Sequence, residues 1–185
     1  MDGETLRDGI FALHTRRFGS VAEVLIKRLV DLGKARNLFH DLYNDFASKR
    51  VEVKFSRALR QSEIKVTEST VLQCIEMATS EQRLLCWNER LTAKFDCNIQ
   101  QVKRAEFDDL YYGIFFSDCV AIFHIESEEI GSQIFYSDFQ HKGNIGEGQF
   151  HINTDSFSVH EENYLYRRIS YETLFELLGG NTEPT

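Results

Sequence analysis

The 185-residue sequence has a single proline, Pro184, and only 11 glycines. Linkers and low-complexity segments are usually rich in these residues, and the chain shows neither such a stretch nor an internal repeat. Hydrophobic residues make up 42% of the chain and aromatic residues 12%, enough to fill a core and to exclude long disorder. We therefore expect one globular domain over residues 1–185.

Long apolar runs are also missing, since no stretch approaches the roughly 18 residues needed to cross a membrane. The first four residues do not begin a basic and then apolar leader. The four cysteines contain no Cys-x-x-Cys pair and have no histidine at zinc-finger spacing: Cys74, Cys86, Cys97 and Cys119. These absences predict reduced thiols, a cytoplasmic protein and no membrane partner.

An excess of positive charge is lacking too, because the formal net charge is −8. This value argues against a protein that coats nucleic acid by bulk attraction. The charge is uneven, however: residues 1–70 hold 13 Lys and Arg against 10 Asp and Glu, and residues 71–185 hold 8 against 19. If the chain binds DNA, the N-terminal part is expected to supply much of the phosphate contact.

Hydrophobic periodicity predicts a mixture of helices and strands. Residues 20–32 read as a helix with Ser20 at its N-cap, residues 38–55 as a hairpin, and residues 70–78 as a second helix. Further strands are predicted over residues 99–103, 111–116, 120–125 and 164–169, with a short helix at 171–178. The fold class expected is α/β in the mixed α+β sense, with a mixed central sheet flanked by helices.

The strongest chemical pattern is Asp41 followed by Glu52-Val53-Lys54. In a hairpin, an aspartate on one strand can lie beside a Glu-x-Lys on the next, where Glu52 and Lys54 share one face. Two carboxylates suit Mg²⁺, which prefers oxygen ligands and keeps several waters. A lysine beside them can orient or help deprotonate a water that attacks phosphorus.

Two alternatives remain open for this pattern. In a chain with 29 acidic residues the same spacing arises easily, and a solvated strand face with charge pairing would look identical. A second Glu-x-Lys occurs at Glu63-Ile64-Lys65, which we interpret as surface charge because it follows a polar stretch. Asp45 competes with Asp41 as the acidic partner.

Three segments together resemble the PD-(D/E)XK restriction endonucleases: His40-Asp41-Leu42-Tyr43, Val51-Glu52-Val53-Lys54-Phe55-Ser56 and Asn98-Ile99-Gln100-Gln101-Val102-Lys103. The resemblance covers about residues 20–125 as an order of elements, with His40 where the family usually has proline. It implies a nuclease fold with a helix and a further core strand after the Glu-x-Lys strand. It also implies catalysis by Asp41, Glu52 and Lys54, with Mg²⁺ held at Asp41, Glu52 and Val53.

Some residues near this pattern have two readings. Glu23 can act as an accessory acid, but Ser20 and Glu23 also form a capping box, which is the reading we favour. Gln100, Gln101 and Lys103 face either the site and the DNA backbone or solvent. Gln101 is kept as an accessory candidate.

A glycine-spaced segment near the C-terminus predicts an added DNA-recognition hairpin over residues 133–153. Amide, imidazole and ammonium groups of this type pair with base edges, and a two-stranded ribbon fits the major groove. A solvated glycine turn is the alternative. The base-reading candidates are Gln140, His141, Lys142, Asn144, Gln149, His151 and Asn153.

These patterns lead to one main hypothesis and two rivals. The main one is a Mg²⁺-dependent type II restriction endonuclease that cuts double-stranded DNA. A palindromic site would require a homodimer, and a methyltransferase could act on the same site. The rivals are a repair or recombination nuclease of the same fold that reads DNA shape, and a non-catalytic DNA-binding or interaction module.

Overall fold

A six-stranded sheet forms the central layer of the computed structural model, which describes residues 1–62, 64–139 and 146–180. The strand order is β1-β2-β3-β5-β6-β8; β3 and β5 run parallel and every other neighbouring pair is antiparallel. The sheet is therefore mixed and mostly antiparallel. Its strands are β1 (Gly33–Lys34), β2 (Leu42–Asn44), β3 (Lys49–Arg57), β5 (Asp109–Phe115), β6 (Val120–Glu126) and β8 (Leu165–Ile169).

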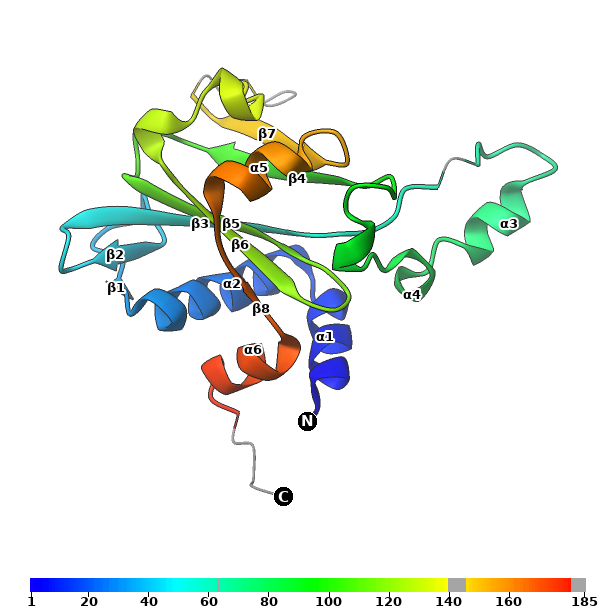
Figure 1. The fold of residues 1–185 in the computed structure, drawn as a ribbon, viewed down its shortest axis with the longest axis horizontal. Coiled ribbons are helices and arrows are strands. Elements are labelled where there is room, and N and C mark those ends of the chain that lie inside the picture. Colours follow the sequence, from blue (N-terminus) through cyan, green and yellow to red (C-terminus); the bar gives the residue numbers. More distant parts are fainter. Residues whose placement is uncertain (63, 140–145, 181–185) are drawn as a thin grey trace.

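Helices α1 (Gly3–Ala12), α2 (Thr15–Val30) and α6 (Tyr171–Leu177) cover one face of this sheet (Figure 1). Their apolar side chains pack on alternate residues of β3, β5 and β6, which point to the same face because strand side chains alternate. Phe18 of α2 is buried and meets Phe115 edge-on, with ring centroids 5.1 Å apart. This contact anchors α2 on β5 of the central sheet.

The opposite face carries a second, two-stranded sheet made of β4 (Asp96–Val102) and β7 (Gly148–Asn153), together with α5 (Phe157–Tyr164). We call the two-stranded sheet the β4–β7 ribbon. An aromatic cluster fills the space between the layers, and the Tyr112 hydroxyl bonds Nδ1 of His160 at 2.9 Å. Burial lowers the pKa of His160 to about 4, so this core histidine is neutral.

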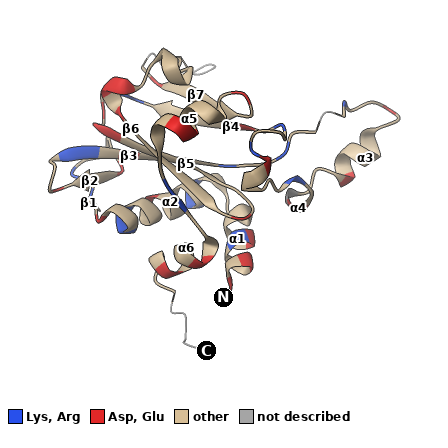
Figure 2. Cartoon of the chain, in the orientation of Figure 1, with Lys and Arg blue, Asp and Glu red and all other residues tan. Residues whose placement is uncertain are grey.

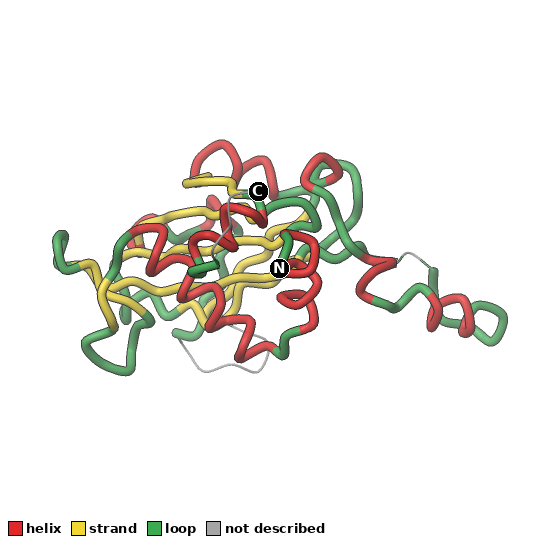
Figure 3. Tube along the Cα trace, turned by 90° about the horizontal axis from the view of Figure 1, so that it is seen from below, coloured by secondary structure: helices red, strands yellow, loops and turns green. Residues whose placement is uncertain are grey.

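Between β3 and β4 the chain makes an arm that stands away from the body (Figures 1 and 3). The arm contains α3 (Val71–Glu76), which buries none of its residues, and α4 (Ser80–Arg83). Single β-bridges at Leu59 and Arg60 tie its base to the body. Three short 3-10 helices complete the description: η1 (Trp87–Glu89), η2 (Ser127–Glu129) and η3 (Ser132–Ile134).

The structure confirms the expected mixed α+β class and the single domain, with a central sheet flanked by helices. All four cysteines are free. None of the helices in the described part of the chain has both the length and the apolar character needed to cross a bilayer. Figure 2 shows Lys and Arg scattered over several elements, with Asp and Glu between them.

The capping box at Ser20 was a wrong prediction. Helix α2 begins at Thr15, so Ser20 lies inside it, and its hydroxyl donates to the Arg16 carbonyl at 3.3 Å. The helix starts earlier because Phe18 belongs to its buried face, and the sequence pattern did not include this residue. Glu23 is consequently not explained as a cap.

Two predictions about strands also need correction. The segment expected as a further core strand, β4, lies outside the central sheet, and β5 is the parallel neighbour of β3. The expected core of residues 20–125 was too short, because β8 completes the sheet and α1 and α6 pack on it. The helix expected after β3 exists as α3 but stands in the arm.

The hairpin expected over residues 133–153 forms only in part. Its second strand is β7, but β7 pairs along its length with β4. In the described residues 133–139 the chain instead makes η3 and a single β-bridge between Ser137 and Gln149. β7 pairs with β4, a strand distant in the sequence, more extensively than with the segment that precedes it. Local periodicity does not show such long-range pairing.

Candidate active site

The β2–β3 hairpin brings Asp41 to Glu52 and Lys54. The Asp41 N–H donates to the Val51 carbonyl at 3.1 Å, and the Val53 N–H donates back to Asp41 Oδ2 at 2.9 Å. Val51 and Val53 are buried against the helices, so Glu52 and Lys54 point to the face that carries the β4–β7 ribbon. The sequence therefore places the three residues together through local strand geometry.

Lys54 lies between the two carboxylates. Its Nζ donates to Glu52 Oε1 and is 3.8 Å from Asp41 Oδ2. The side chains of Asp41 and Lys54 are about a quarter exposed, whereas that of Glu52 is 12% exposed. The group is thus shielded from solvent but open on one side.

The pKa of Glu52 is raised to about 7. Burial is the main cause; nearby Asp41 and Glu106 raise it further, while the charge of Lys54 opposes them. A carboxyl group that ionises close to neutral pH needs compensating positive charge to remain a stable anion. Perturbed carboxyl groups in a cleft are characteristic of functional sites, although structural ion pairs produce them too.

An open pocket of about 190 Å³ surrounds the three residues. Its wall includes Gln101, which is the extra residue of a β-bulge in β4 and has a left-handed φ of 57°. Bulges of this kind redirect a side chain, and left-handed backbone costs energy for any residue except glycine. The accessory prediction for Gln101 therefore agrees with its position. The pocket is lined by Leu38, Phe39, His40, Asp41, Glu52, Lys54, Gln101, Lys103, Glu106 and Glu147.

Sequence reasoning missed Glu106 and Glu147 in this pocket. Lys103 Nζ lies 3.6 Å from Glu106 and 3.4 Å from Glu147, so the three form an ion-paired part of the pocket lining. Glu147 directly precedes β7, so the pairing of β7 with β4 positions it at the pocket. The sequence shows Glu147 between two glycines, but no short-range pattern indicates that it lies near Glu52.

The two remaining accessory candidates, Glu23 and Asp45, differ in their relation to the pocket. Burial and the charge of Asp41 raise the pKa of Glu23, and Lys54 lowers it, so the Glu23 carboxylate lies in the electrostatic field of the site. Asp45 instead pairs with Arg36 at 2.8 Å on the exposed turn and does not line the pocket. Asp41, and not Asp45, is therefore the acidic partner of Glu52.

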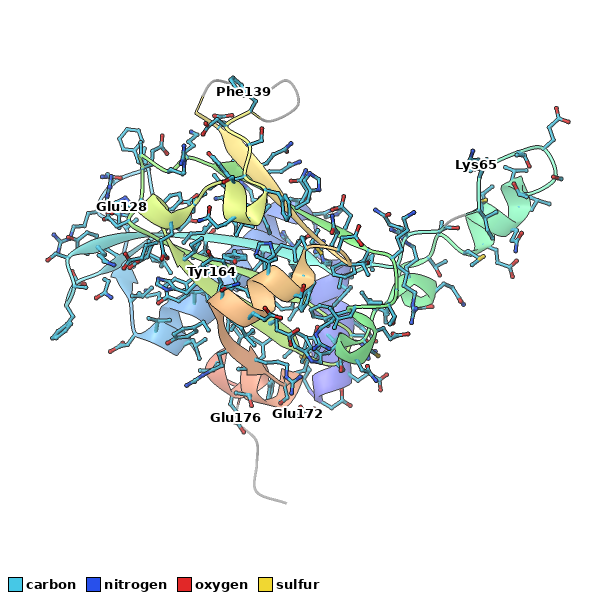
Figure 4. All side chains as sticks on the ribbon, turned by 45° about the horizontal axis from the view of Figure 1, so that its top comes forward. Lys65, Glu128, Phe139, Tyr164, Glu172 and Glu176 are labelled. Atoms are coloured by element: carbon cyan, nitrogen blue, oxygen red, sulfur yellow. The ribbon has the colours of Figure 1, made fainter. Side chains whose placement is uncertain are left out.

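The second Glu-x-Lys is remote from this pocket. Lys65 lies on the arm, and Figure 4 shows it far from the central sheet. Glu63 lies outside the described residues. Placement on the arm agrees with the interpretation of this pattern as surface charge.

The DNA-reading candidates fall into two groups. Gln140, His141, Lys142 and Asn144 lie outside the described residues. Gln149, His151 and Asn153 lie on the outer face of β7, where burial alternates with Phe150 and Ile152 on the inner face. All three already have side-chain partners. Gln149 Oε1 accepts from Asn98 Nδ2 at 3.3 Å, and His151 Nδ1 bonds Asp96 at 2.8 Å. Asn153 Oδ1 accepts the N–H groups of Asp155 and Ser156, both at 3.0 Å.

No known protein family, curated protein or solved structure matches this chain. The chemistry of the pocket must therefore be inferred from its own geometry.

The free oxygens of the pocket decide whether a cation fits. Within the described residues no three His, Cys, Asp or Glu side chains form a ready-made metal-binding group. Asp41 uses Oδ2 for Val53 and Glu52 uses Oε1 for Lys54, so Oδ1 and Oε2 are without hydrogen bonds in the described part of the chain. Mg²⁺ commonly takes one or two carboxylates and completes its shell with water and phosphate oxygens. The donor set therefore fits this ion.

Proposed function

We propose that the chain is a Mg²⁺-dependent endonuclease of the PD-(D/E)XK type that hydrolyses phosphodiester bonds in double-stranded DNA. The observation that carries the proposal is the convergence of Asp41, Glu52 and Lys54 at one open pocket. Each carboxylate keeps a free oxygen, and Lys54 lies between them. Two acids at one cleft can hold the metal ion, and the lysine beside them can act on the attacking water in metal-assisted phosphodiester hydrolysis.

Each residue has a separate task in this proposal. Asp41 and Glu52, with the Val53 carbonyl beside them, would hold Mg²⁺, whose charge offsets that of the phosphate and favours ionisation of a water. Lys54 orients the attacking water and stabilises the negative charge that develops on phosphorus. The water oxygen bonds to phosphorus while the bond to the 3′ oxygen breaks, leaving a 5′-phosphate and a 3′-hydroxyl.

The proposed function also explains why so many carboxylates are gathered at the pocket despite their mutual repulsion. Five carboxylates influence or line it, namely Glu23, Asp41, Glu52, Glu106 and Glu147. Lys54 and Lys103 offset part of this negative charge, and the remainder would repel a DNA phosphate when no divalent cation is bound. A bound divalent cation reverses this balance and allows the phosphate to enter.

A homodimer is the assembly that this function favours. A palindromic DNA site presents the same phosphodiester to two pockets related by a two-fold axis. A paired methyltransferase would then protect the same site. Light scattering of the purified chain with and without duplex DNA measures the assembly.

Digestion of supercoiled plasmid with Mg²⁺ tests the proposal and its nearest rival. Sequence-specific cleavage gives discrete fragments, and DNA ligase rejoins them without prior kinase treatment because the ends carry 5′-phosphate. A continuous smear would favour the nuclease of the same fold that reads DNA shape. Intact plasmid with every divalent cation tried would leave the non-catalytic module.

A further inference from the structure

The outer face of the β4–β7 ribbon is an amide surface that begins at the edge of the pocket. In β4 the outward residues are Asp96, Asn98 and Gln100, and the inward ones belong to the core. The register sets Asn98 opposite His151 and Gln100 opposite Gln149. Two strands therefore contribute alternate polar side chains to one face.

This face lacks the positive charge that a phosphate-binding surface needs. Neither β4 nor β7 contains a lysine or arginine, and Figure 2 shows both strands almost entirely without charge. The acidic Asp96 is matched by its hydrogen bond with His151. Sequence-independent binding to DNA requires lysine and arginine, whereas amides pair with base edges.

The amides on this face are incompletely satisfied. Asn98 Nδ2 donates to Gln149 Oε1 at 3.3 Å, but Asn98 Oδ1 is buried and lacks a hydrogen-bond partner in the described part of the chain. Gln100 is exposed, and its side chain makes no hydrogen bond to a described residue. A buried acceptor without a donor costs free energy. A ligand that supplies a donor to Asn98 Oδ1 would therefore favour a rearrangement of the Asn98 and Gln149 side chains.

The bulge fixes how this face lies relative to the pocket. Gln101 turns into the pocket while Gln100, one residue earlier, stays on the outer face, and Glu147 enters the pocket directly before β7. Strand residues rise about 3.3 Å each, close to the 3.4 Å between base pairs, so Gln100 and Asn98 lie about one and about three base-pair steps from Gln101 along the ribbon. DNA with a phosphate in the pocket can thus run along the amide face.

We infer that Asn98, Gln100 and Gln149 read base edges in the DNA groove and set the sequence preference of the proposed nuclease. The inference rests on the proposed function for the position of the DNA. It places base reading on the β4–β7 ribbon, which carries the predicted Gln149, and adds two residues of β4. Asn153 is left out of base reading, because its side-chain oxygen already accepts two backbone N–H groups in the turn that follows β7.

Mapping of cleavage ends on random-sequence DNA tests this inference. We expect Gln100→Ala and Gln149→Ala each to lower discrimination at one or two base pairs by about tenfold, and Asn98→Ala to do so at a neighbouring position. Gln82→Ala, an exposed glutamine of α4, is the matched control and should keep the wild-type preference. Thermal unfolding confirms that each variant is folded.

Selection of bound duplexes by the Glu52→Gln chain separates this inference from the proposed function. Enriched sequences that depend on Gln100 and Gln149 support base reading even if the wild-type chain cuts no DNA. Cleavage without any sequence preference would overturn base reading and leave the nuclease proposal intact. Unchanged preference in all three variants, uniform weakening on every sequence or no DNA binding would each overturn it.

Discussion

Asp41 Oδ2 accepts the Val53 N–H at 2.9 Å, so the acidic strand end is fixed to the middle of the Glu-x-Lys segment. This bond extends the β2–β3 pairing beyond Leu42, the first residue of β2. It leaves the second oxygen of Asp41 without a hydrogen bond in the described part of the chain, in a residue that lines the same pocket as Glu52. The position of Asp41 is thus set by the backbone of the strand that carries the other two residues.

Asp41→Asn and Glu52→Gln should each abolish Mg²⁺-dependent cleavage while DNA binding survives. An amide oxygen can still accept the Val53 N–H, so the hairpin should remain folded, but the negative charge that attracts the cation is lost. Cleavage assays and binding titrations with Ca²⁺ in place of Mg²⁺ measure the two properties separately. Full cutting by either variant would place the active site elsewhere.

Lys54→Ala should lower the single-turnover cleavage rate at least about a hundredfold, the scale for losing a positioned acid–base group. Lys65→Ala is the matched control, because the same Glu-x-Lys spacing places this lysine on the arm. We expect wild-type cleavage from the control. The reverse pattern would show that the wrong Glu-x-Lys was chosen.

The raised pKa of Glu52 predicts how metal-free stability depends on pH. The fold favours the protonated carboxyl, so this contribution is present below about pH 4.5 and is lost as pH rises through about 7. At 1.36 kcal/mol for each unit of pKa, the loss amounts to at most about 3 kcal/mol.

Without metal, Glu52→Gln should therefore be more stable than the wild type at pH 8 and similar to it at pH 4.5. Urea unfolding at the two pH values measures the difference. Mg²⁺ should stabilise the wild type but not the variant, because ligands that bind only the folded state raise its stability. A variant that is less stable at pH 8 would contradict the burial of an ionisable carboxyl at this position.

Two serines distinguish true from apparent helix caps. The Ser170 hydroxyl accepts the Thr173 N–H at 3.2 Å at the start of α6, so Ser170→Ala should lower the free energy of unfolding by about 1 kcal/mol. Ser20→Ala should change it by less than about 0.5 kcal/mol, because Ser20 lies within α2. Equal losses from both would restore the capping box at Ser20.

The central part of the site was predictable because it is local. Asp41 directly precedes the first strand of one hairpin and Glu52 and Lys54 lie on its second strand, where alternation alone places them on one face. The class of fold was predictable for a similar reason, since apolar periodicity marks most strands of the sheet. Both conclusions required only short-range patterns.

The rest of the pocket depends on pairing between distant segments. Gln101, Glu106 and Glu147 reach Glu52 because β4 pairs with β7 about 50 residues away and carries a bulge. Hydrophobic alternation gives the strand but not its partner or its register. Glu23 was misread for another reason: Ser20 and Glu23 match a capping sequence inside a helix that had already begun.

Plasmid cleavage by the wild-type chain and by Glu52→Gln, purified and assayed side by side, is the decisive measurement for the proposed nuclease. We expect the wild type to convert supercoiled plasmid to cut forms in a Mg²⁺-dependent reaction that EDTA abolishes, and the variant to convert none. Equal cutting by the two proteins, or intact plasmid with the wild type in every divalent cation, would contradict the proposal.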